Sequence, residues 1–156
     1  MKYKCTLIAV KDMEKAKAFY KALLGLEIVL DAGANVMLTG GIALQTADTW
    51  AGLIHKQEGE IVFANNAAEL YFETDDMDGF MEKLEAFGDI VCLHPLMEHS
   101  WGQRAVRFYD CDCHIIEVGE NLAMVIKRFM EEGLTLEQTA KRMDVGVDYI
   151  LQTLEA

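Results

Sequence analysis

The sequence predicts an α+β fold in which a βαβββ module occurs twice and a helical extension follows. Three observations support this prediction. A strand, a capped helix and three short strands follow one another from residue 3, and the same order starts again near residue 68. Hydrophobic residues make up 52% of the 156 residues, which is sufficient for a packed interior. Residues 120–156 then change to helical periodicity.

Charge and composition restrict the partners of this chain. The 14 Lys and Arg residues against 26 Asp and Glu give a net charge of −12, which repels phosphates and disfavours nucleic acid and anionic membranes as partners. No apolar run approaches the roughly 20 residues of a membrane span, and the N-terminal residues lack the apolar core of a signal peptide. We therefore expect a cytoplasmic protein whose four cysteines are reduced thiols.

The first module begins with an apolar strand at Tyr3–Val10. Asp12 is a suitable N-cap for the helix that follows, because its carboxylate can accept from the free amides of the first turn. Gly25 stands where a left-handed C-terminal cap is expected. The predicted strands after the helix are Leu26–Leu30, Asn35–Thr39 and Ile42–Thr46, the last two joined through Gly40-Gly41. A short helix is expected at Asp48–His55.

The second module repeats this order. The Asp-Met pair at residues 12–13 recurs at residues 76–77, 64 residues later, after the strand Glu69–Thr74 and before a helix that closes at Gly88. Its remaining strands are predicted at Ile90–Leu93, Arg104–Tyr109 and His114–Gly119, with a turn at Asp110–Cys113. Neither module can bury both its helix and its sheet face alone, so two modules must cooperate.

The segment 120–156 is predicted to be a helical tail. Its first helix has an apolar face, Thr135 and Gln138 form a capping box for the second, and Val147–Leu154 forms the third. The arrangement is similar to a helix-turn-helix. The third helix carries no Lys or Arg for phosphates or bases. We therefore expect a packing or dimer-forming role and disfavour DNA binding.

Two signatures within residues 1–119 make the chain resemble the vicinal oxygen chelate superfamily. The first is Val10-Lys11-Asp12-Met13 with Phe19-Tyr20, and the second is Trp101-Gly102-x-Arg104 with Asp110, Asp112 and Glu117. The superfamily includes glyoxalase I, bleomycin-resistance proteins and extradiol dioxygenases. The resemblance implies that the paired modules at 1–119 form a curved sheet around a cavity that takes a small molecule.

The resemblance also implies four inward-facing positions that hold one divalent ion in the metal-using members. By register these are Cys5, Gln45, Glu69 and Glu117 here, with Glu69 and Glu117 as the candidate catalytic residues. Zinc, nickel, manganese or iron are the metals to consider. One thiolate, two carboxylates and an amide suit none of these metals well, and none of the four positions is a histidine. We therefore favour a metal-free site. Cys5 would then be a core residue, and Glu117 would bond to Gln45 or to an arginine.

A second group of candidates occurs at residues 98–104. Trp101 could form a wall of the substrate pocket, His99 could carry a proton near neutral pH, and Arg104 or Arg107 could grip a carboxylate or phosphate. The alternative is an exposed loop that Trp101 fixes to the sheet. Cys111 and Cys113 are interpreted as members of a plain turn, because no second pair of zinc ligands accompanies them.

Three functional hypotheses remain open. The first is a glyoxalase-like lyase or isomerase in which Glu69 or Glu117 moves a proton. The second is a metal-free small-molecule-binding protein of the resistance type. The third is a regulator that senses a ligand and acts through its helical tail. A homodimer is expected in each case, because the modules and the tail leave apolar surface to be covered.

Overall fold

The computed structural model describes residues 1–155, which form two compact units. The first unit consists of Met1–Ala68 and the turn Asp110–His114, and the second consists of Glu69–Tyr109 and the chain from Ile115 onward. Each unit contains one four-stranded mixed sheet, and the helices of the tail follow in the second unit. This arrangement confirms the predicted α+β fold with two βαβββ modules and a helical extension.

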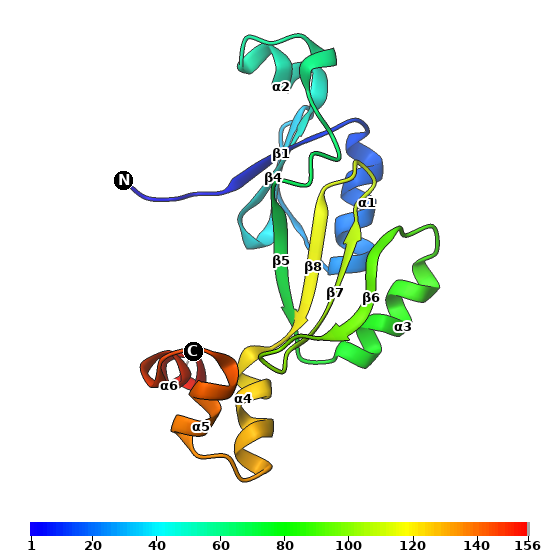
Figure 1. The fold of residues 1–156 in the computed structure, drawn as a ribbon. Coiled ribbons are helices and arrows are strands. Elements are labelled where there is room, and N and C mark those ends of the chain that lie inside the picture. The colour runs from blue at the N-terminus through cyan, green and yellow to red at the C-terminus, as the bar shows by residue number, and fades with distance from the viewer. Residues whose placement is uncertain (156) are drawn as a thin grey trace. The chain divides into compact units, whose positions relative to one another are not determined.

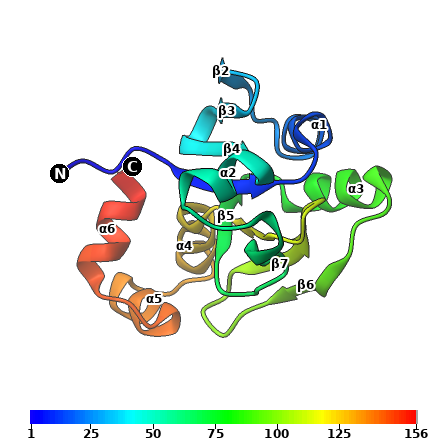
Figure 2. The same cartoon turned by 90° about the horizontal axis from the view of Figure 1, so that it is seen from above.

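The first unit holds the first module and the connection that follows it. Its strands are β1 (Thr6–Val10), β2 (Ile28–Asp31), β3 (Asn35–Leu38) and β4 (Ile42–Thr46). Its helical elements are α1 (Met13–Leu24), η1 (Thr39–Gly41), α2 (Ala47–Leu53) and η2 (Glu58–Glu60). The strand order is β1-β4-β3-β2, with β1 parallel to β4 and the other pairs antiparallel. Figure 2 shows β2, β3 and β4 following one another in this order, with α1 beside them.

The second unit repeats the topology and adds the tail. Its strands are β5 (Glu69–Thr74), β6 (Cys92–Glu98), β7 (Arg104–Tyr109) and β8 (Ile115–Glu120). Its helices are α3 (Met77–Phe87), α4 (Leu122–Glu131), α5 (Leu136–Met143) and α6 (Val147–Glu155). The strand order is β5-β8-β7-β6, and Figure 1 shows these strands side by side. β5 runs parallel to β8, as β1 does to β4.

The helix ends confirm the local predictions. Asp12 accepts a hydrogen bond from Lys15 N at 3.0 Å, and Asp76 accepts one from Gly79 N at 2.9 Å. Each carboxylate satisfies an amide that the first helical turn leaves free. Gly25 ends α1 with φ of 69° and ψ of 18°, the left-handed conformation that a residue without Cβ adopts at low cost.

Apolar residues on one face of each sheet form the interior. In the first unit, Val10, Tyr20, Leu23, Val36 and Leu44 are fully buried or nearly so. In the second, Val106, Phe108, Ile116 and Val118 are buried, and the ring of Phe80 in α3 contacts Phe108 at a centroid distance of 6.2 Å. The opposite face of the second sheet is therefore available for polar side chains.

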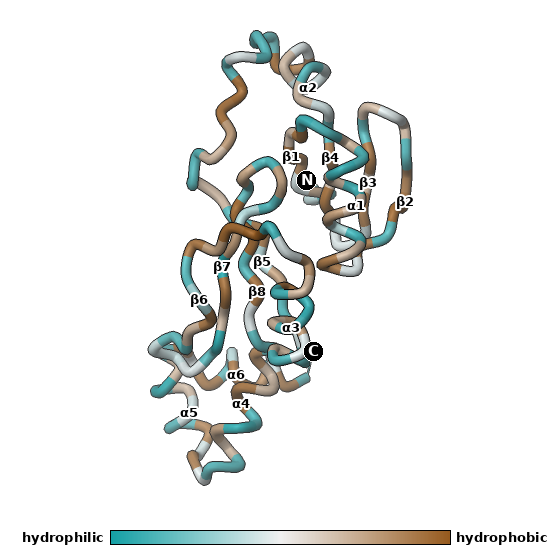
Figure 3. The backbone as a smooth tube through the Cα atoms, turned by 90° about the vertical axis from the view of Figure 1, so that its right-hand side faces the viewer, coloured by the Kyte–Doolittle hydropathy of each residue, from teal (hydrophilic) through white to brown (hydrophobic). Residues whose placement is uncertain are grey.

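The tail has an apolar core of its own. Val125, Ile126, Phe129, Ala140, Met143 and Ile150 are its buried members. The capping box at the start of α5 is present, since Thr135 accepts from Gln138 N and the side chain of Gln138 accepts from Thr135 N. Both brown and teal stretches occur in the helices of the tail in Figure 3, as expected of amphipathic helices.

Two strand predictions need correction. The strand predicted at Ile90–Leu93 is β6 at Cys92–Glu98, and the strand predicted from Tyr3 begins at Thr6. β6 contains Pro95, which cannot donate to a ladder, but β6 is an edge strand and tolerates it. Cys5 consequently lies just before β1. None of the helices within residues 1–155 is long and apolar enough to cross a membrane.

Candidate functional site

One face of the second sheet carries the polar side chains. Parallel pairing of β5 with β8 places Tyr71 opposite Glu117, and antiparallel pairing of β7 with β8 places Arg107 opposite the same residue. Directly paired residues lie on the same face of a sheet, and so do residues two positions away. Glu69, two positions before Tyr71, therefore shares this face with Arg107 and Glu117.

Arg107 lies at the centre of this face. Its Nε donates to Glu69 Oε2 at 2.9 Å, and its Nη2 forms a close ion pair with Glu117 Oε2. The Glu117 side chain is 5% exposed, and within residues 1–155 its Oε2 has no hydrogen-bond partner apart from this ion pair. A buried carboxylate needs a compensating charge. Arg107 supplies it, so one of the two partners expected for Glu117, an arginine, is present.

Two histidines also contact the Arg107 guanidinium. Arg107 Nη1 lies 3.5 Å from His94 Nε2 and 3.4 Å from His99 Nε2. His94 Nδ1 lies 2.8 Å from the Pro95 carbonyl oxygen, which only accepts, so Nδ1 carries a proton and donates it to this oxygen. We call Glu69, His94, His99, Arg107 and Glu117 the Arg107 cluster.

His99 is stacked on Trp101, with the ring centroids 4.3 Å apart and the planes 6° from parallel. Burial lowers the pKa of His99 below its usual value, and the charges of Arg107 and His94 lower it further. The neutral imidazole is therefore the favoured form near neutral pH. This arrangement brings together two of the predicted pocket residues, His99 and Trp101.

Hydrogen bonds hold Trp101 in place through Gln103. Trp101 Nε1 donates to Gln103 Oε1 at 3.0 Å, and Gln103 Nε2 donates to Tyr71 Oη at 2.8 Å and to the Glu120 carbonyl at 2.7 Å. Burial raises the pKa of Tyr71 to about 12, so its hydroxyl stays protonated and donates to Glu73 at 2.8 Å. The aromatic side chains next to the cluster are thus fixed before any ligand arrives.

Arg104 lies apart from this face. It is three residues before Arg107 in β7, so its side chain is on the opposite face. There it bonds to Glu120 through Nε at 2.8 Å and to Asp78 through Nη1 at 2.8 Å. Both arginines of β7 are therefore paired with carboxylates. A ligand anion would have to displace a carboxylate to reach either one.

The other two candidate metal ligands, Cys5 and Gln45, are in the first unit and do not contact each other. Gln45 is 5% exposed and bonds to Asn35 at 2.8 Å and to Thr49 at 2.6 Å. Thr6 pairs with Ile42, so Cys5 is level with Gly41, four positions from Gln45. At about 3.3 Å per residue, the two lie roughly 13 Å apart along the strand direction. They share a face of the sheet but are not adjacent.

The residues at the four implied positions do not fit a divalent ion. Glu69 and Glu117 already bind a permanent cation, the guanidinium of Arg107, where a metal would have to be. In addition, residues 1–155 contain no group of three or more His, Cys, Asp and Glu side chains arranged to hold a metal.

The turn between β7 and β8 is built around Asp110. Asp110 Oδ2 accepts from Tyr20 Oη at 2.7 Å and lies 2.9 Å from His114 Nδ1, and its Oδ1 accepts from the backbone of Asp112 and His114. Burial raises the pKa of Cys111 to about 12, so its thiol is protonated at neutral pH. The arrangement agrees with a structural turn.

Sequence reasoning did not identify every residue of this site. The sequence suggests Arg107 as a residue that grips an anion, but it indicates neither a role for His94 nor the hydrogen bonds from Gln103 to Trp101 and Tyr71. The available signal was a carboxylate in one predicted strand and an arginine in the strand before it, since strands joined by a short turn pair with each other. The register that makes them opposite could not be obtained from one sequence.

Comparison with known proteins places the chain among glyoxalase-like proteins. The family model of the glyoxalase-like domain matches residues 3–123. A crystal structure of a protein of unknown function from Agrobacterium tumefaciens str. C58 is 34% identical, with a TM-score of 0.69, and the match covers 77% of this chain and 94% of that one. Among curated proteins, none matches the chain.

Two further solved structures have related descriptions. A member of the glyoxalase/bleomycin resistance protein/dioxygenase superfamily from Sphaerobacter thermophilus DSM 20745 is 27% identical, with a TM-score of 0.60, over 77% of this chain and 97% of that one. A lactoylglutathione lyase from Agrobacterium tumefaciens is 24% identical, with a TM-score of 0.58, over 75% and 91%. The second likeness concerns the fold alone.

Proposed function

Because the chain belongs to the glyoxalase-like family, we propose that it binds a small molecule at the Arg107 cluster without using a metal ion. The observation that supports this proposal is the position of Arg107, whose guanidinium joins Glu69 and Glu117. These two carboxylates are the ones that the family resemblance assigns to a metal. The Arg107 guanidinium balances the charge of these carboxylates, as a metal ion would. The face of the sheet remains available for a ligand.

The charges and rings on this face favour an organic cation with an aromatic ring. Three carboxylates, those of Glu69, Glu73 and Glu117, share the face with the single guanidinium of Arg107. Tyr71 is 46% exposed and offers a ring on which a cation can lie. The net charge of −12 also raises the local concentration of cations.

Calorimetric titration with two matched probes tests this proposal. Benzyltrimethylammonium is expected to bind, and benzenesulfonate, with a similar ring and the opposite charge, is not. Glu69→Gln should weaken binding of the cation about tenfold, since it removes one exposed carboxylate. Glu82→Gln, on the exposed surface of α3, is the control. Binding that EDTA abolishes and that added zinc, nickel or manganese restores would contradict the metal-free proposal.

A lyase or isomerase activity is the second candidate. The observation in its favour is His99, whose lowered pKa leaves a neutral imidazole 3.4 Å from the Arg107 guanidinium. His99 could accept a proton next to a carbonyl group while the guanidinium stabilises the negative charge that develops on oxygen. The hemithioacetal of methylglyoxal and glutathione is a suitable test substrate. Thioester formation that persists in EDTA and is lost in His99→Gln would support this activity.

A homodimer remains the proposed assembly. The edge strand β2 exposes Ile28, Val29 and Leu30 by 46%, 62% and 55%. An exposed apolar edge strand is a template for pairing with another chain. Light scattering should give twice the chain mass of 17.5 kDa. Replacing Val29 by Lys should shift the protein to the monomer.

A further inference from the structure

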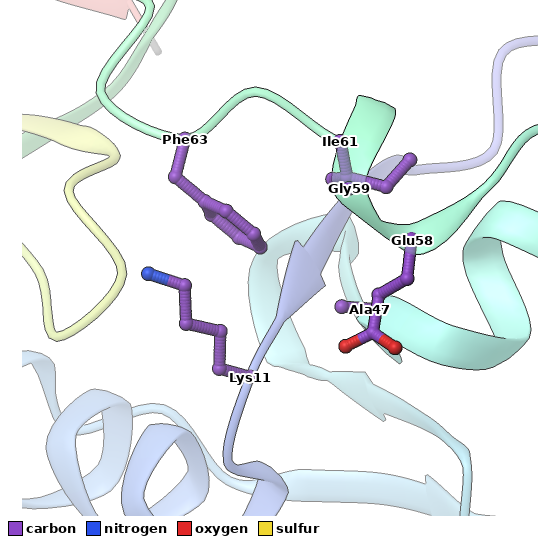
Figure 4. A pocket seen from close by; sticks show the side chains of 6 residues that line it. All are labelled: Lys11, Ala47, Glu58, Gly59, Ile61 and Phe63. Carbon is purple, nitrogen blue, oxygen red and sulfur yellow. The ribbon is translucent and has the colours of Figure 1, made fainter.

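A pocket of the first unit has no part in the proposed function. Its volume is about 420 Å³, within the range of small-ligand sites. Both charged and apolar side chains border it (Figure 4). The lining residues are Lys11, Ala47, Glu58, Gly59, Ile61 and Phe63. Two opposite charges and an apolar wall thus belong to one pocket.

Lys11 is the cation of this pocket. Its Nζ lies 4.3 Å from the centre of the Phe63 ring, and no carboxylate of residues 1–155 forms an ion pair with it. Its backbone N donates to Asp112 Oδ2 at 3.2 Å, which fixes the base of the side chain. The Asp112 carboxylate attracts this ammonium without forming an ion pair with it, so the ammonium keeps capacity for a ligand carboxylate.

Phe63 also contacts His114. Its ring meets the ring of His114 edge-on at a centroid distance of 6.0 Å. His114 is itself held by the buried carboxylate of Asp110, 2.9 Å from Nδ1. The apolar wall that carries the Lys11 ammonium therefore rests on a fixed hydrogen-bonded turn.

Glu58 is the anion of this pocket. It begins η2, where its neighbours Lys56 and Glu60 pair with each other at 3.0 Å. The Glu58 carboxylate is left without a cation among the described residues. In Figure 4, Lys11 extends toward Phe63, whereas the Glu58 carboxylate lies near Ala47. The two charges are therefore separated, with Ile61 and Phe63 as the apolar lining.

We propose that this pocket binds a small zwitterion whose charges are separated by an apolar body, of the class represented by an apolar dipeptide. The ligand carboxylate binds Lys11, its ammonium binds Glu58, and its apolar side chain packs on Phe63 and Ile61. Both pocket charges then gain ion-pair partners that residues 1–155 do not supply. A ligand with one charge satisfies only one of the two.

The test uses four forms of one probe with the full-length protein. Alanyl-phenylalanine carries both charges, its N-acetyl derivative only the negative one, its C-terminal amide only the positive one, and the doubly blocked peptide neither. Calorimetry should show the free dipeptide binding at least about tenfold more tightly than either singly blocked form. Equal affinities for all four forms, or no binding of the free dipeptide at about 10 mM, would overturn the proposal.

Variants assign the two charges. Lys11→Met should weaken binding of the free dipeptide about tenfold and leave binding of the C-terminal amide unchanged. Glu58→Gln should also weaken binding of the free dipeptide about tenfold, but it should leave binding of the N-acetyl form unchanged. Lys56→Met is the matched control, because this lysine is in the same segment and pairs with Glu60. A loss of affinity in Lys56→Met as large as in Lys11→Met would refute the assignment.

Discussion

The two βαβββ modules have the same topology but carry different residues at equivalent positions of their strand pairs. Their strand orders, β1-β4-β3-β2 and β5-β8-β7-β6, correspond element by element. The repeat of 64 residues makes Leu7 the counterpart of Tyr71. Leu7 pairs with Ala43, however, whereas Tyr71 pairs with Glu117. By strand pairing, the first-module counterpart of Glu117 is therefore Ala43.

This difference explains why the two modules place their polar side chains differently. Glu69 and Glu117 are two positions apart along the ladder, and one guanidinium reaches both. Cys5 and Gln45 are four positions apart, and Gln45 bonds instead to Asn35 and Thr49. A repeat of topology does not imply a repeat of the site, since a shift of two positions retains the face but changes the neighbours.

The turns before the last strands differ as well. In the first module Thr39–Gly41 makes the turn, with Gly40 and Gly41 both at φ of 78°. In the second module Asp110–His114 makes it, held by the Asp110 carboxylate rather than by glycine. The turn before the last strand is thus formed through glycine conformations in one module and through side-chain hydrogen bonds in the other.

Among variants that distinguish the two modules, Arg107→Met is expected to change the free energy of unfolding most. The change leaves Glu117 buried without its cation, and removing one partner of a buried pair costs about 3–5 kcal/mol. Urea denaturation should show this loss, and added manganese or zinc should recover part of it by taking the place of the guanidinium. The first-module control is Asn35→Ala, at the neutral pair with Gln45, which should cost about 1 kcal/mol.

A double variant sharpens the same test. Arg107→Met combined with Glu117→Gln removes both members of the pair, so the double variant should be more stable than Arg107→Met alone. Equal stability of the single and double variants would show that Glu117 does not depend on Arg107.

Local features of the fold were predictable from the sequence because their causes are local. The N-caps Asp12 and Asp76, the C-cap Gly25 and the capping box at Thr135 each depend on a few neighbouring residues. The family resemblance then gave the topology, which the structure and the family match confirm. The edge strand β6 was misplaced, since Pro95 interrupts its pattern.

Site residues were predictable only where a single strand or loop carried the signal. Glu117 was identified because a carboxylate stands in the middle of an apolar strand, and His99 and Trp101 because they are close in sequence. The pairing of Arg107 with Glu69 joins residues 38 positions apart, and that of Tyr20 with Asp110 joins residues 90 apart. Such contacts depend on register and packing, which one sequence does not contain.

The second-largest change in stability is expected at glycines with positive φ in the two modules. A Cβ on Gly102, at φ of 89°, would lie 2.1 Å from Phe129 Cζ, whereas a Cβ on Gly41, at φ of 78°, would meet nothing nearer than 3.6 Å. Gly41→Ala should therefore cost only the backbone strain, about 1 kcal/mol. Gly102→Ala should cost about 2–4 kcal/mol, because the ring of Phe129 must also move. Thermal unfolding of both variants measures the difference.

A smaller effect is expected at the Asp110 turn. Burial alone would raise the pKa of Asp110, but hydrogen bonds from His114 and Tyr20 hold it below its usual value. Asp110 therefore adds stability above its unfolded-state pKa of about 3.9, and this contribution is lost as pH falls through the lower folded-state pKa. Asp110→Asn should cost about 1–3 kcal/mol at pH 7. The difference from the parent protein should shrink in acid, and a constant difference down to about pH 2 would contradict this account.

The smallest effect is expected at His99 in the second module. Burial, Arg107 and His94 all lower its pKa, so the unfolded chain takes up the proton more readily than the folded chain does. Stability should therefore fall as pH decreases through the usual histidine value of about 6.5, until the folded protein also binds the proton. His99→Gln should flatten the change in melting temperature between about pH 7 and pH 5. His55→Asn is the control, because His55 is exposed at φ of 58°, which Asn tolerates. If the two variants had the same pH profile, the fold would not lower the pKa of His99.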